Sequence, residues 1–141
     1  MTKEKIVTKY GKFWPREVFD IFDKNALVVR ELRELQEHGV YILYRDDMPY
    51  YVGKTKGRLC DRLHAHSNKA TDKYFQFWNY FSFFVVPDPN DLDQVEGILI
   101  ASMPTLNIAQ TRKIERIRVP SNIGKVLRRR RKIEVKVNGD N

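Results

Sequence analysis

Residues 39–53 have the sequence GVYILYRDDMPYYVG. The first six and the last four of these residues are rich in β-branched and aromatic side chains, which favour strands, and the Asp-Asp-Met-Pro segment between them is typical of a turn. Side chains alternate across a strand, so Tyr41 shares a face with Gly39, and Tyr51 shares a face with Gly53. The stretch predicts a β-hairpin with a surface hollow lined by phenols. Ordinary packing of tyrosines on a sheet is the alternative, and by itself the commoner one.

Other elements follow from the hydrophobic period and from the residues that begin and end helices. We expect helices over residues 15–22, 26–38, 57–66 and 91–103, and a third strand over residues 81–86. Ile133, Val135 and Val137 alternate, as in a short edge strand or a frayed end. This order predicts an α/β fold of the α+β sandwich type, with a small, mostly antiparallel three-stranded sheet flanked by helices.

The positive charge is concentrated near the C-terminal end. The chain has 26 Lys and Arg residues against 18 Asp and Glu residues, a formal net charge of +8. Residues 1–111 carry 15 basic and 15 acidic side chains, whereas residues 112–136 carry 11 basic and 2 acidic ones. Such a block indicates a polyanionic partner, most often nucleic acid, because neutralised phosphates release their counterions. A solvated tail that aids solubility or contacts anionic lipid is the alternative.

Composition excludes several classes of protein. Hydrophobic residues make up 42% of the 141 residues, enough for one folded domain with short appendages. The one cysteine, Cys60, cannot form an internal disulfide, and no Cys/His cluster has zinc-finger spacing. No apolar run is long enough to cross a membrane, and the polar first residues lack the apolar core of a signal peptide. We therefore expect an intracellular protein, cytoplasmic or in the nucleoid or nucleus, with no membrane partner.

One carboxylate lies within an apolar helix face. Positions three, four and seven apart share a face, which groups Leu92, Glu96, Leu99, Ile100 and Met103. An ionised carboxylate in such a stripe must be paired, hydrogen-bonded or bound to a metal, because burying an unpaired charge is costly. Taken alone, the pattern favours a carboxylate at the edge of the stripe that pairs with a structural arginine.

Basic side chains recur on the helix expected over residues 57–66. Arg58, Arg62 and His66 are spaced four residues apart and form a row of two guanidinium groups and an imidazole. Such a row suits phosphate oxygens, because arginine offers a planar fork of donors. An ordinary basic face, with the stem of Arg62 lying beside the core, explains the pattern equally well.

The order of these features resembles the GIY-YIG nuclease superfamily. Gly39-Val40-Tyr41 and, nine residues later, Tyr51-Val52-Gly53 are similar to its two naming motifs, with valine in place of both isoleucines. Arg62 lies eleven residues after Tyr51, near the position of the family arginine, and His66 follows where many members have histidine.

The resemblance continues through the second half of the family pattern. Glu96 occupies the position of the one catalytic glutamate on a helix, and Asn107 follows a proline in Pro-Thr-Leu-Asn. Asn107 would then fix the glutamate or the backbone beside it. The likeness covers about residues 38–110, and it extends neither to residues 1–37 nor to the segment after about residue 115.

The resemblance implies hydrolysis of a DNA phosphodiester bond with one divalent ion, leaving 5′-phosphate and 3′-hydroxyl ends. Glu96 would be the sole protein ligand of Mg²⁺ or Mn²⁺, which is chemically sufficient because Mg²⁺ commonly keeps several waters. Arg62 would stabilise the charge that builds on the scissile phosphate. Tyr41 would activate the attacking water, and Tyr51 would orient water or phosphate.

A tyrosine base requires a perturbed pKa, because an ordinary phenol is almost fully protonated at neutral pH. We expect Lys54, Arg62 and the metal to lower the pKa of Tyr41. Lys54 would otherwise relay the proton itself or bind phosphate. His66 would hydrogen-bond a tyrosine or a phosphate.

Two other functions compete with the nuclease hypothesis. A non-catalytic nucleic-acid-binding module would keep the fold and use the basic C-terminal segment as its main contact, but a decayed site would usually have lost one of the matching residues. A small structural or ribosome-associated protein would require five accidental matches in the correct order.

We expect three parts along the chain: an N-terminal helical extension over residues 1–37, a catalytic domain over residues 38–115 and a basic C-terminal tail over residues 116–141. Substrate would be bound by Arg58 and by the tail residues Lys125, Arg128, Arg129, Arg130, Arg131 and Lys132. DNA is the expected partner, and RNA remains open. A single metal site cuts one strand, so a double-strand cut would need a dimer or two nicks, and the sequence does not choose between these.

Overall fold

The structure is a computed structural model that describes residues 5–74, 76–105 and 114–139, the last six of these by their backbone alone. Its central sheet contains the strands β1 (Lys9–Pro15), β4 (Gly39–Arg45), β5 (Met48–Thr55) and β6 (Tyr80–Val85). Their order in the sheet is β1-β6-β4-β5, and every neighbouring pair is antiparallel. The fold is therefore an α+β sandwich, as the sequence predicts, but its sheet has four strands rather than three.

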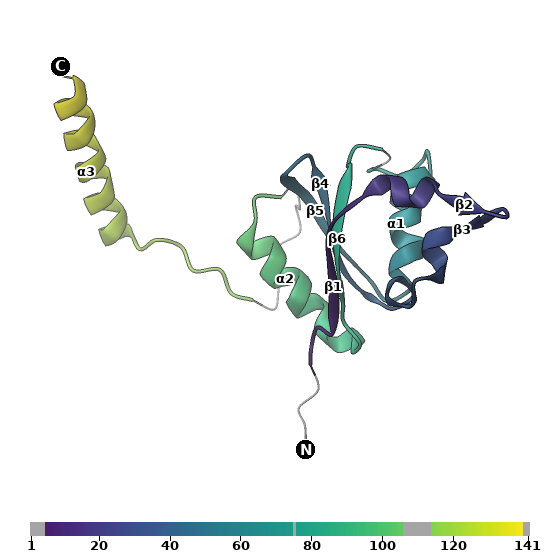
Figure 1. Ribbon diagram of the computed structural model, residues 1–141. Coiled ribbons are helices and arrows are strands. Elements are labelled where there is room, and N and C mark those ends of the chain that lie inside the picture. Colours follow the sequence, from purple (N-terminus) through teal and green to yellow (C-terminus); the bar gives the residue numbers. More distant parts are fainter. Residues whose placement is uncertain (1–4, 75, 106–113, 140–141) are drawn as a thin grey trace.

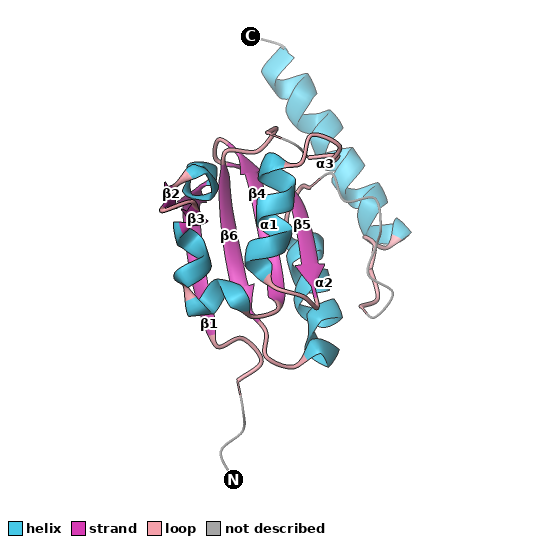
Figure 2. Cartoon of the chain, turned by 90° about the vertical axis from the view of Figure 1, so that its right-hand side faces the viewer, coloured by secondary structure: helices cyan, strands magenta, loops and turns pink. Residues whose placement is uncertain are grey.

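The predicted hairpin is confirmed, and its register brings the tyrosine of one arm to the glycine of the other. Tyr41 lies opposite Gly53, and Leu43 lies opposite Tyr51. The pairing shifts after Leu43, which leaves Tyr50 as an extra residue in β5, so the strand carries a bulge beside the turn. Strand β5 forms one edge of the sheet, as Figure 2 shows.

Helices cover both faces of the sheet and bury two hydrophobic clusters (Figure 1). One face packs against α1 (Leu59–Asn68) and three 3₁₀ helices, over Arg16–Asp20, Val28–Glu31 and Arg33–Gln36. The other face packs against α2 (Leu92–Ser102), which a short 3₁₀ turn over Pro89–Asp91 precedes. Alternation along β4 divides the strand between the two layers, because Tyr41 and Leu43 belong to the α1 cluster whereas Val40 and Ile42 belong to the α2 cluster.

The expected helices over residues 15–22 and 26–38 are wrong. Besides the 3₁₀ helices, this part contains a two-residue hairpin, β2 (Phe22–Asp23) with β3 (Ala26–Leu27). Its turn residues Lys24 and Asn25 have φ angles of 51° and 67°, the left-handed conformation that a tight hairpin turn requires and an α-helix forbids. The predicted N-terminal helical extension is therefore replaced by 3₁₀ helices and strands, and β1 belongs to the main sheet.

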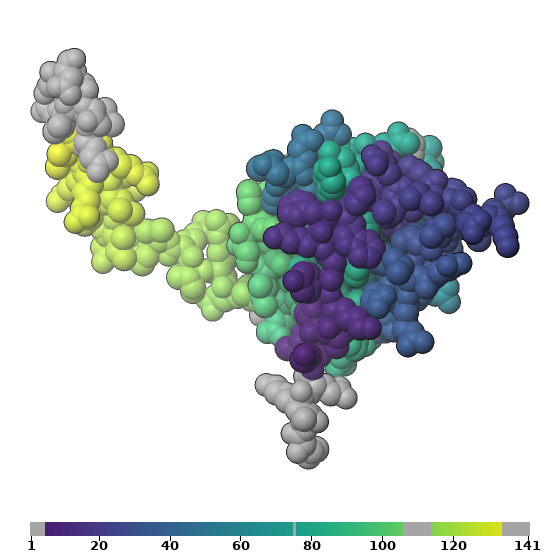
Figure 3. All heavy atoms as spheres, in the orientation of Figure 1, coloured from purple at the N-terminus to yellow at the C-terminus, as the bar shows by residue number. Residues whose placement is uncertain are grey.

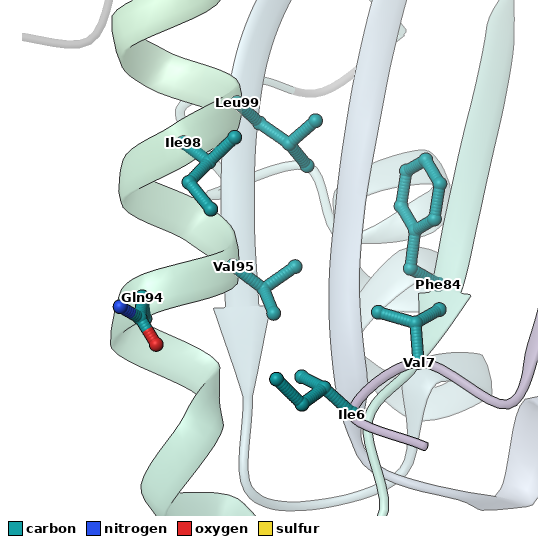
Figure 4. A pocket seen from close by; sticks show the side chains of 7 residues that line it. All are labelled: Ile6, Val7, Phe84, Gln94, Val95, Ile98 and Leu99. Atoms are coloured by element: carbon teal, nitrogen blue, oxygen red, sulfur yellow. The ribbon is translucent and has the colours of Figure 1, made fainter.

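Helix α2 is held on the sheet by its apolar residues. Leu92 is buried, and Val95, Leu99, Ile100 and Met103 pack against the cluster on this face, which confirms the predicted apolar stripe. An open apolar groove runs between this helix and the sheet, where Val95 and Leu99 point toward Phe84 (Figure 4). Asp91, the residue before this helix, makes no capping hydrogen bond through its side chain.

The basic segment forms one long helix, α3 (Ser121–Gly139), instead of the edge strand or frayed end expected at residues 133–137. Lysine and arginine are good helix formers, and three alternating residues are too short a pattern to outweigh them. Figure 1 shows this helix apart from the sheet and its covering helices, and in Figure 3 the yellow atoms of its first part lie away from the main body of the chain. Among the residues that the structure describes, no helix has the length and apolar character needed to cross a membrane.

Candidate active site around strand β5

Tyr41 is buried against the strand opposite it. Its side chain is fully shielded from solvent, and a Cβ atom placed on Gly53 would overlap both Cζ and Oη of the Tyr41 ring. The absent side chain of Gly53 therefore makes the space that the ring occupies. The predicted open hollow is thus filled by the tyrosine itself, and Tyr41 presents only its hydroxyl end to polar partners.

We expect the variant Gly53→Ala to be destabilised by about 1–3 kcal/mol, because the new methyl group would force a buried ring to move. Gly57→Ala is a matched control four residues later, since a Cβ there meets nothing closer than Thr55 Oγ1 at 3.5 Å. Urea denaturation of both variants measures the difference. Equal stability of the two proteins would show that Tyr41 does not depend on Gly53 for its position.

Helix α1 brings two side chains to the Tyr41 hydroxyl. His66 Nε2 lies 2.7 Å from Tyr41 Oη, and Arg62 Nε donates a longer hydrogen bond of 3.4 Å to the same oxygen. His66 is almost fully buried, whereas Arg62 is exposed, so the phenol joins a buried imidazole to a guanidinium at the surface. The predicted spacing of four residues on one helix face places both groups on one tyrosine.

The imidazole has a second partner that the sequence did not indicate. His66 Nδ1 lies 2.9 Å and 3.0 Å from the two carboxylate oxygens of Asp72, and Asp72 Oδ1 also accepts the backbone N–H of Tyr74 at 2.8 Å. Asp72 lies in the segment after α1, four residues past its last residue. That segment has no period that could relate it to the helix, so the contact is visible only in three dimensions.

Tyr51 and Tyr74 form the outer wall of this cluster. Their rings stack with centroids 4.3 Å apart and planes inclined by 28°. The centroids of Tyr41 and His66 lie 6.3 Å and 6.2 Å from the Tyr51 ring. Tyr51 is partly buried, so it lies between the buried Tyr41–His66 pair and the solvent.

Glu96 lies on the other face of the sheet. Its side chain is 20% exposed, and its carboxylate lies 3.5 Å from Lys54 Nζ, which also forms an ion pair with Asp93 one turn earlier on α2. Burial raises the pKa of Glu96, while Lys54 opposes that rise. The partner of this carboxylate is therefore a lysine from β5, not the structural arginine of the alternative interpretation.

The edge strand β5 lies between the tyrosine–histidine cluster on one face of the sheet and Glu96 on the other. Tyr51 points to the α1 face and Lys54 to the α2 face, as their odd spacing along a strand requires. Burial raises the pKa of Tyr51, and the negative charge of Glu96 adds to this rise, so the two side chains lie within electrostatic reach of each other. Tyr51 and Lys54 therefore present their side chains on opposite faces of one edge strand.

The expectation of a lowered pKa for Tyr41 is wrong. Burial raises the pKa of its phenol well above the usual value, and Arg62 opposes this rise only in part. Lys54 pairs with Asp93 and Glu96 on α2, and these carboxylates raise the pKa of Lys54. Lys54 is therefore not placed to lower the pKa of the Tyr41 phenol. Tyr41 is therefore a protonated hydrogen-bonding group in this structure.

Other predicted residues lie apart from this cluster or outside the described ranges. Arg58 is exposed at the residue before α1. Asn107 falls outside the described residues. The tail residues Lys125, Arg128, Arg129, Arg130, Arg131 and Lys132 are exposed on α3.

The carboxylates on α2 have the chemistry of a site for a hard divalent cation. Within the described ranges, no group of three or more His, Cys, Asp or Glu residues is placed to hold a metal. A lone carboxylate still suits Mg²⁺, which keeps most of its water ligands. The ammonium group of Lys54 already stands between Glu96 and Asp93, so this position accommodates a positive charge. Glu96, partly shielded and directed toward β5, fits the role of metal ligand.

Comparison with known proteins gives a limited set of matches. No protein-family model matches the chain, and no curated protein matches it. Among solved structures, the chain is similar to the GIY-YIG N-terminal endonuclease domain of UvrC from Thermotoga maritima. A point mutant of that domain bound to its catalytic divalent cation has 28% identity and a TM-score of 0.47, with 62% of this chain and 100% of that chain covered. The magnesium-bound form has 29% identity and a TM-score of 0.44, with 57% and 92% covered.

The structure also places the sequence motifs of this chain relative to one another. The Gly-Val-Tyr and Tyr-Val-Gly segments pair in register on adjacent strands, and the helix that follows them brings Arg62 and His66 to Tyr41. Glu96 follows on a helix after the third strand of the motif. These motifs, in this order and on these elements, are similar to those of the GIY-YIG nuclease superfamily.

Proposed function

We propose that this protein is a metal-dependent endonuclease that hydrolyses DNA phosphodiester bonds and leaves 5′-phosphate and 3′-hydroxyl ends. The observation that carries the proposal is the assembly of a phenol, a guanidinium group and a shielded carboxylate around one edge strand, β5. Tyr41 and Arg62 lie on one face of this strand and Glu96 on the other. We further propose that the protein acts inside the cell, where its DNA substrate is found.

The roles that we propose follow from the surroundings of each side chain. Glu96 would hold Mg²⁺ or Mn²⁺, and a bound divalent cation supplies Lewis-acid stabilisation of the leaving oxygen. Arg62 is exposed and keeps donors for a phosphate oxygen, so it would stabilise the charge of the pentavalent transition state. Lys54 neutralises the carboxylates of α2 and would limit their repulsion of the phosphate. Tyr51, at the solvent side of the cluster, would orient the attacking water.

The substrate would be held by the tail, with a smaller contribution from Arg58. The tail residues Lys125, Arg128, Arg129, Arg130, Arg131 and Lys132 share one exposed helix, around which they offer a dense set of cations to the phosphate backbone. Direct reading of base edges is not needed for this contact, so we expect binding with little sequence preference.

We expect removal of residues 121–141 to weaken DNA binding at least about tenfold at moderate salt and to flatten its salt dependence. The slope should fall by about 0.9 for each phosphate that the tail neutralises in the full-length protein. Fluorescence anisotropy across a salt series measures both quantities. Replacing Arg128–Lys132 by glutamine retains a helix-forming segment and should give most of the same loss. An unchanged salt slope in both proteins would show that the tail does not bind the backbone.

Cleavage of a panel of nucleic acids tests the proposed function. We expect nicking of plasmid or of branched DNA in Mg²⁺ or Mn²⁺ and none in EDTA, with single-stranded DNA and RNA in parallel reactions. Ligation of the products by DNA ligase checks for the 5′-phosphate and 3′-hydroxyl ends. Binding without cleavage of any substrate in the panel would instead favour a nucleic-acid-binding module.

A further inference from the structure

A carboxylate, an imidazole and a phenol form a continuous hydrogen-bonded row beneath the proposed cutting site. We propose that Asp72 is a positioning residue that fixes the tautomer of His66, so that His66 can accept the proton of Tyr41 while a water molecule attacks the phosphate. The inference rests on the proposed nuclease function, and it adds to that function a residue and a route for the proton.

The geometry of the row determines which nitrogen carries the proton. An ionised carboxylate can only accept hydrogen bonds, so His66 Nδ1, at 2.9 Å and 3.0 Å from the Asp72 oxygens, must carry its hydrogen there. Burial raises the pKa of Asp72, but the hydrogen bonds from His66 and from the N–H of Tyr74 hold it below its usual value. The lone pair of neutral His66 is then on Nε2, 2.7 Å from Tyr41 Oη, and the phenol donates to it.

This row solves a difficulty of tyrosine catalysis. Burial raises the pKa of Tyr41, so the residue is protonated before the attacking water reaches it. A phenol that donates to an imidazole avoids the anion, because it passes its own proton on as it receives another. General base catalysis of this kind typically contributes about 10²–10⁴-fold to a rate.

The step balances as a double proton transfer. A proton of the attacking water moves to Tyr41 Oη, which requires the side chains that shield this hydroxyl to move when substrate binds, and the Tyr41 hydroxyl proton moves to His66 Nε2. The water oxygen forms the new bond to phosphorus, and the bond to the 3′ oxygen breaks with its electron pair left on that oxygen, which solvent protonates. His66 becomes an imidazolium beside the Asp72 carboxylate, and it returns its proton to solvent after the product leaves.

The other groups around His66 are consistent with this role. Tyr41 faces it from β4, Tyr51 from β5, and Arg62 lies one turn earlier on α1. Asp72 and Tyr74 face it from the segment that follows α1.

Among these neighbours, Asp72 supplies the negative charge that favours an imidazolium. Burial lowers the pKa of His66, Asp72 raises it, and Arg62 lowers it further. Asp72 thus offsets part of the cost of charging a buried ring.

The variant Asp72→Asn tests the role of Asp72 at constant size. The backbone N–H of Tyr74 can only donate, so it would hold the carbonyl oxygen of the new asparagine at the Oδ1 position, 2.9 Å from His66 Nδ1, and place the NH₂ group 3.0 Å from the same nitrogen. A neutral oxygen accepts more weakly than a carboxylate, and the NH₂ group competes by donating, so the tautomer with hydrogen on Nε2, which cannot accept from Tyr41, becomes more populated. We expect cleavage to fall by about 10²–10⁴-fold with DNA affinity unchanged.

The pH profile separates positioning from simple structural support. Cleavage requires neutral His66, so the rate rises with pH through the pKa of His66. Loss of the Asp72 charge lowers that pKa, so in Asp72→Asn the acidic limb of the profile should move to lower pH while the plateau falls. Asp61→Asn is the matched control, because Asp61 lies on α1 but pairs with Arg30 at the surface. A lower plateau with an unmoved limb would overturn the proposal.

The tautomer of His66 is also measurable without any cleavage assay. Side-chain ¹⁵N shifts of the full-length wild-type protein should show His66 protonated at Nδ1, and Asp72→Asn should shift it toward protonation at Nε2. The chain has three histidines, so the His38→Asn and His64→Asn variants identify the signals. If the wild type cuts no substrate, the nuclease proposal fails while the tautomer assignment is still decided. A wild-type His66 protonated at Nε2 would overturn the inference even if Asp72→Asn did not fold.

Discussion

The protein carrying Glu96→Gln should fold and bind DNA as the wild type does, yet lose cleavage by about 10³-fold or more. The carboxylate is the donor that would hold the divalent ion, and glutamine has the same shape without the charge that a hard cation requires. Metal-ion stabilisation of a developing charge is worth several kcal/mol, and each ~1.4 kcal/mol is about tenfold in rate. Initial rates of plasmid nicking at saturating Mg²⁺ measure the effect.

Stability and binding provide the controls for this variant. Lys54 keeps Asp93 as a partner when Glu96 becomes neutral, and the carboxylate no longer has to be partly buried with its charge, so the free energy of unfolding should change little. Glu17→Gln, an exposed glutamate outside the site, is the matched change of charge and should cut normally. Full activity of Glu96→Gln would show that Glu96 does not hold the metal ion.

Arg62→Ala is the second change with a large expected effect, a loss of about 10²–10³-fold in cleavage rate. A donor directed at the charge of a transition state typically has this effect when it is removed. Arg62 also donates to Tyr41 Oη and opposes the rise in that residue's pKa. Its loss would therefore leave the phenol less well oriented and less acidic. Single-turnover cleavage at saturating protein separates this effect from any loss of binding.

Two further variants identify which property of Arg62 matters. Arg62→Lys keeps the charge but replaces a planar fork by a single point donor, so it should recover only part of the rate. Lys69→Ala removes one positive charge at the end of the same helix, where the side chain is exposed, and should cut almost normally. Equal activity of Arg62→Ala and Lys69→Ala would show that Arg62 contributes only its positive charge and not a donor directed at the transition state.

The hairpin and the two α-helices that carry the site were predictable from local patterns. β-branched residues, a turn and a period of 3.6 lie within short stretches, and each is sufficient for its own element. The first 38 residues were not predictable in this way. Gly11 lets β1 approach the ring of Phe83, and the pairing of β1 with β6 shifts between Gly11 and Trp14. Such an interrupted strand shows no alternation, and its partner is some 70 residues away.

The candidate site was predictable to the extent that its residues share an element. Arg62 and His66 are one helical turn apart, so their common target follows from spacing. Burial was not visible in the sequence, and it reverses the expected direction of the pKa of Tyr41. Asp72 and Tyr74 were missed because their contacts join a loop to a helix and a strand. The Lys54–Glu96 pair joins a strand to a helix on the opposite layer.

The proposed site depends on the register between β4 and β5, because its residues lie on both faces of β5. A slip of one residue between β4 and β5 would turn Tyr51 toward α2 and Lys54 toward α1, while most of the hairpin hydrogen bonds would form again. Gly53 would also leave its place opposite Tyr41, and a side chain would have to share the space of that ring. The bulge at Tyr50 and the turn before it therefore fix the register that places Tyr51 and Lys54 on opposite faces of β5.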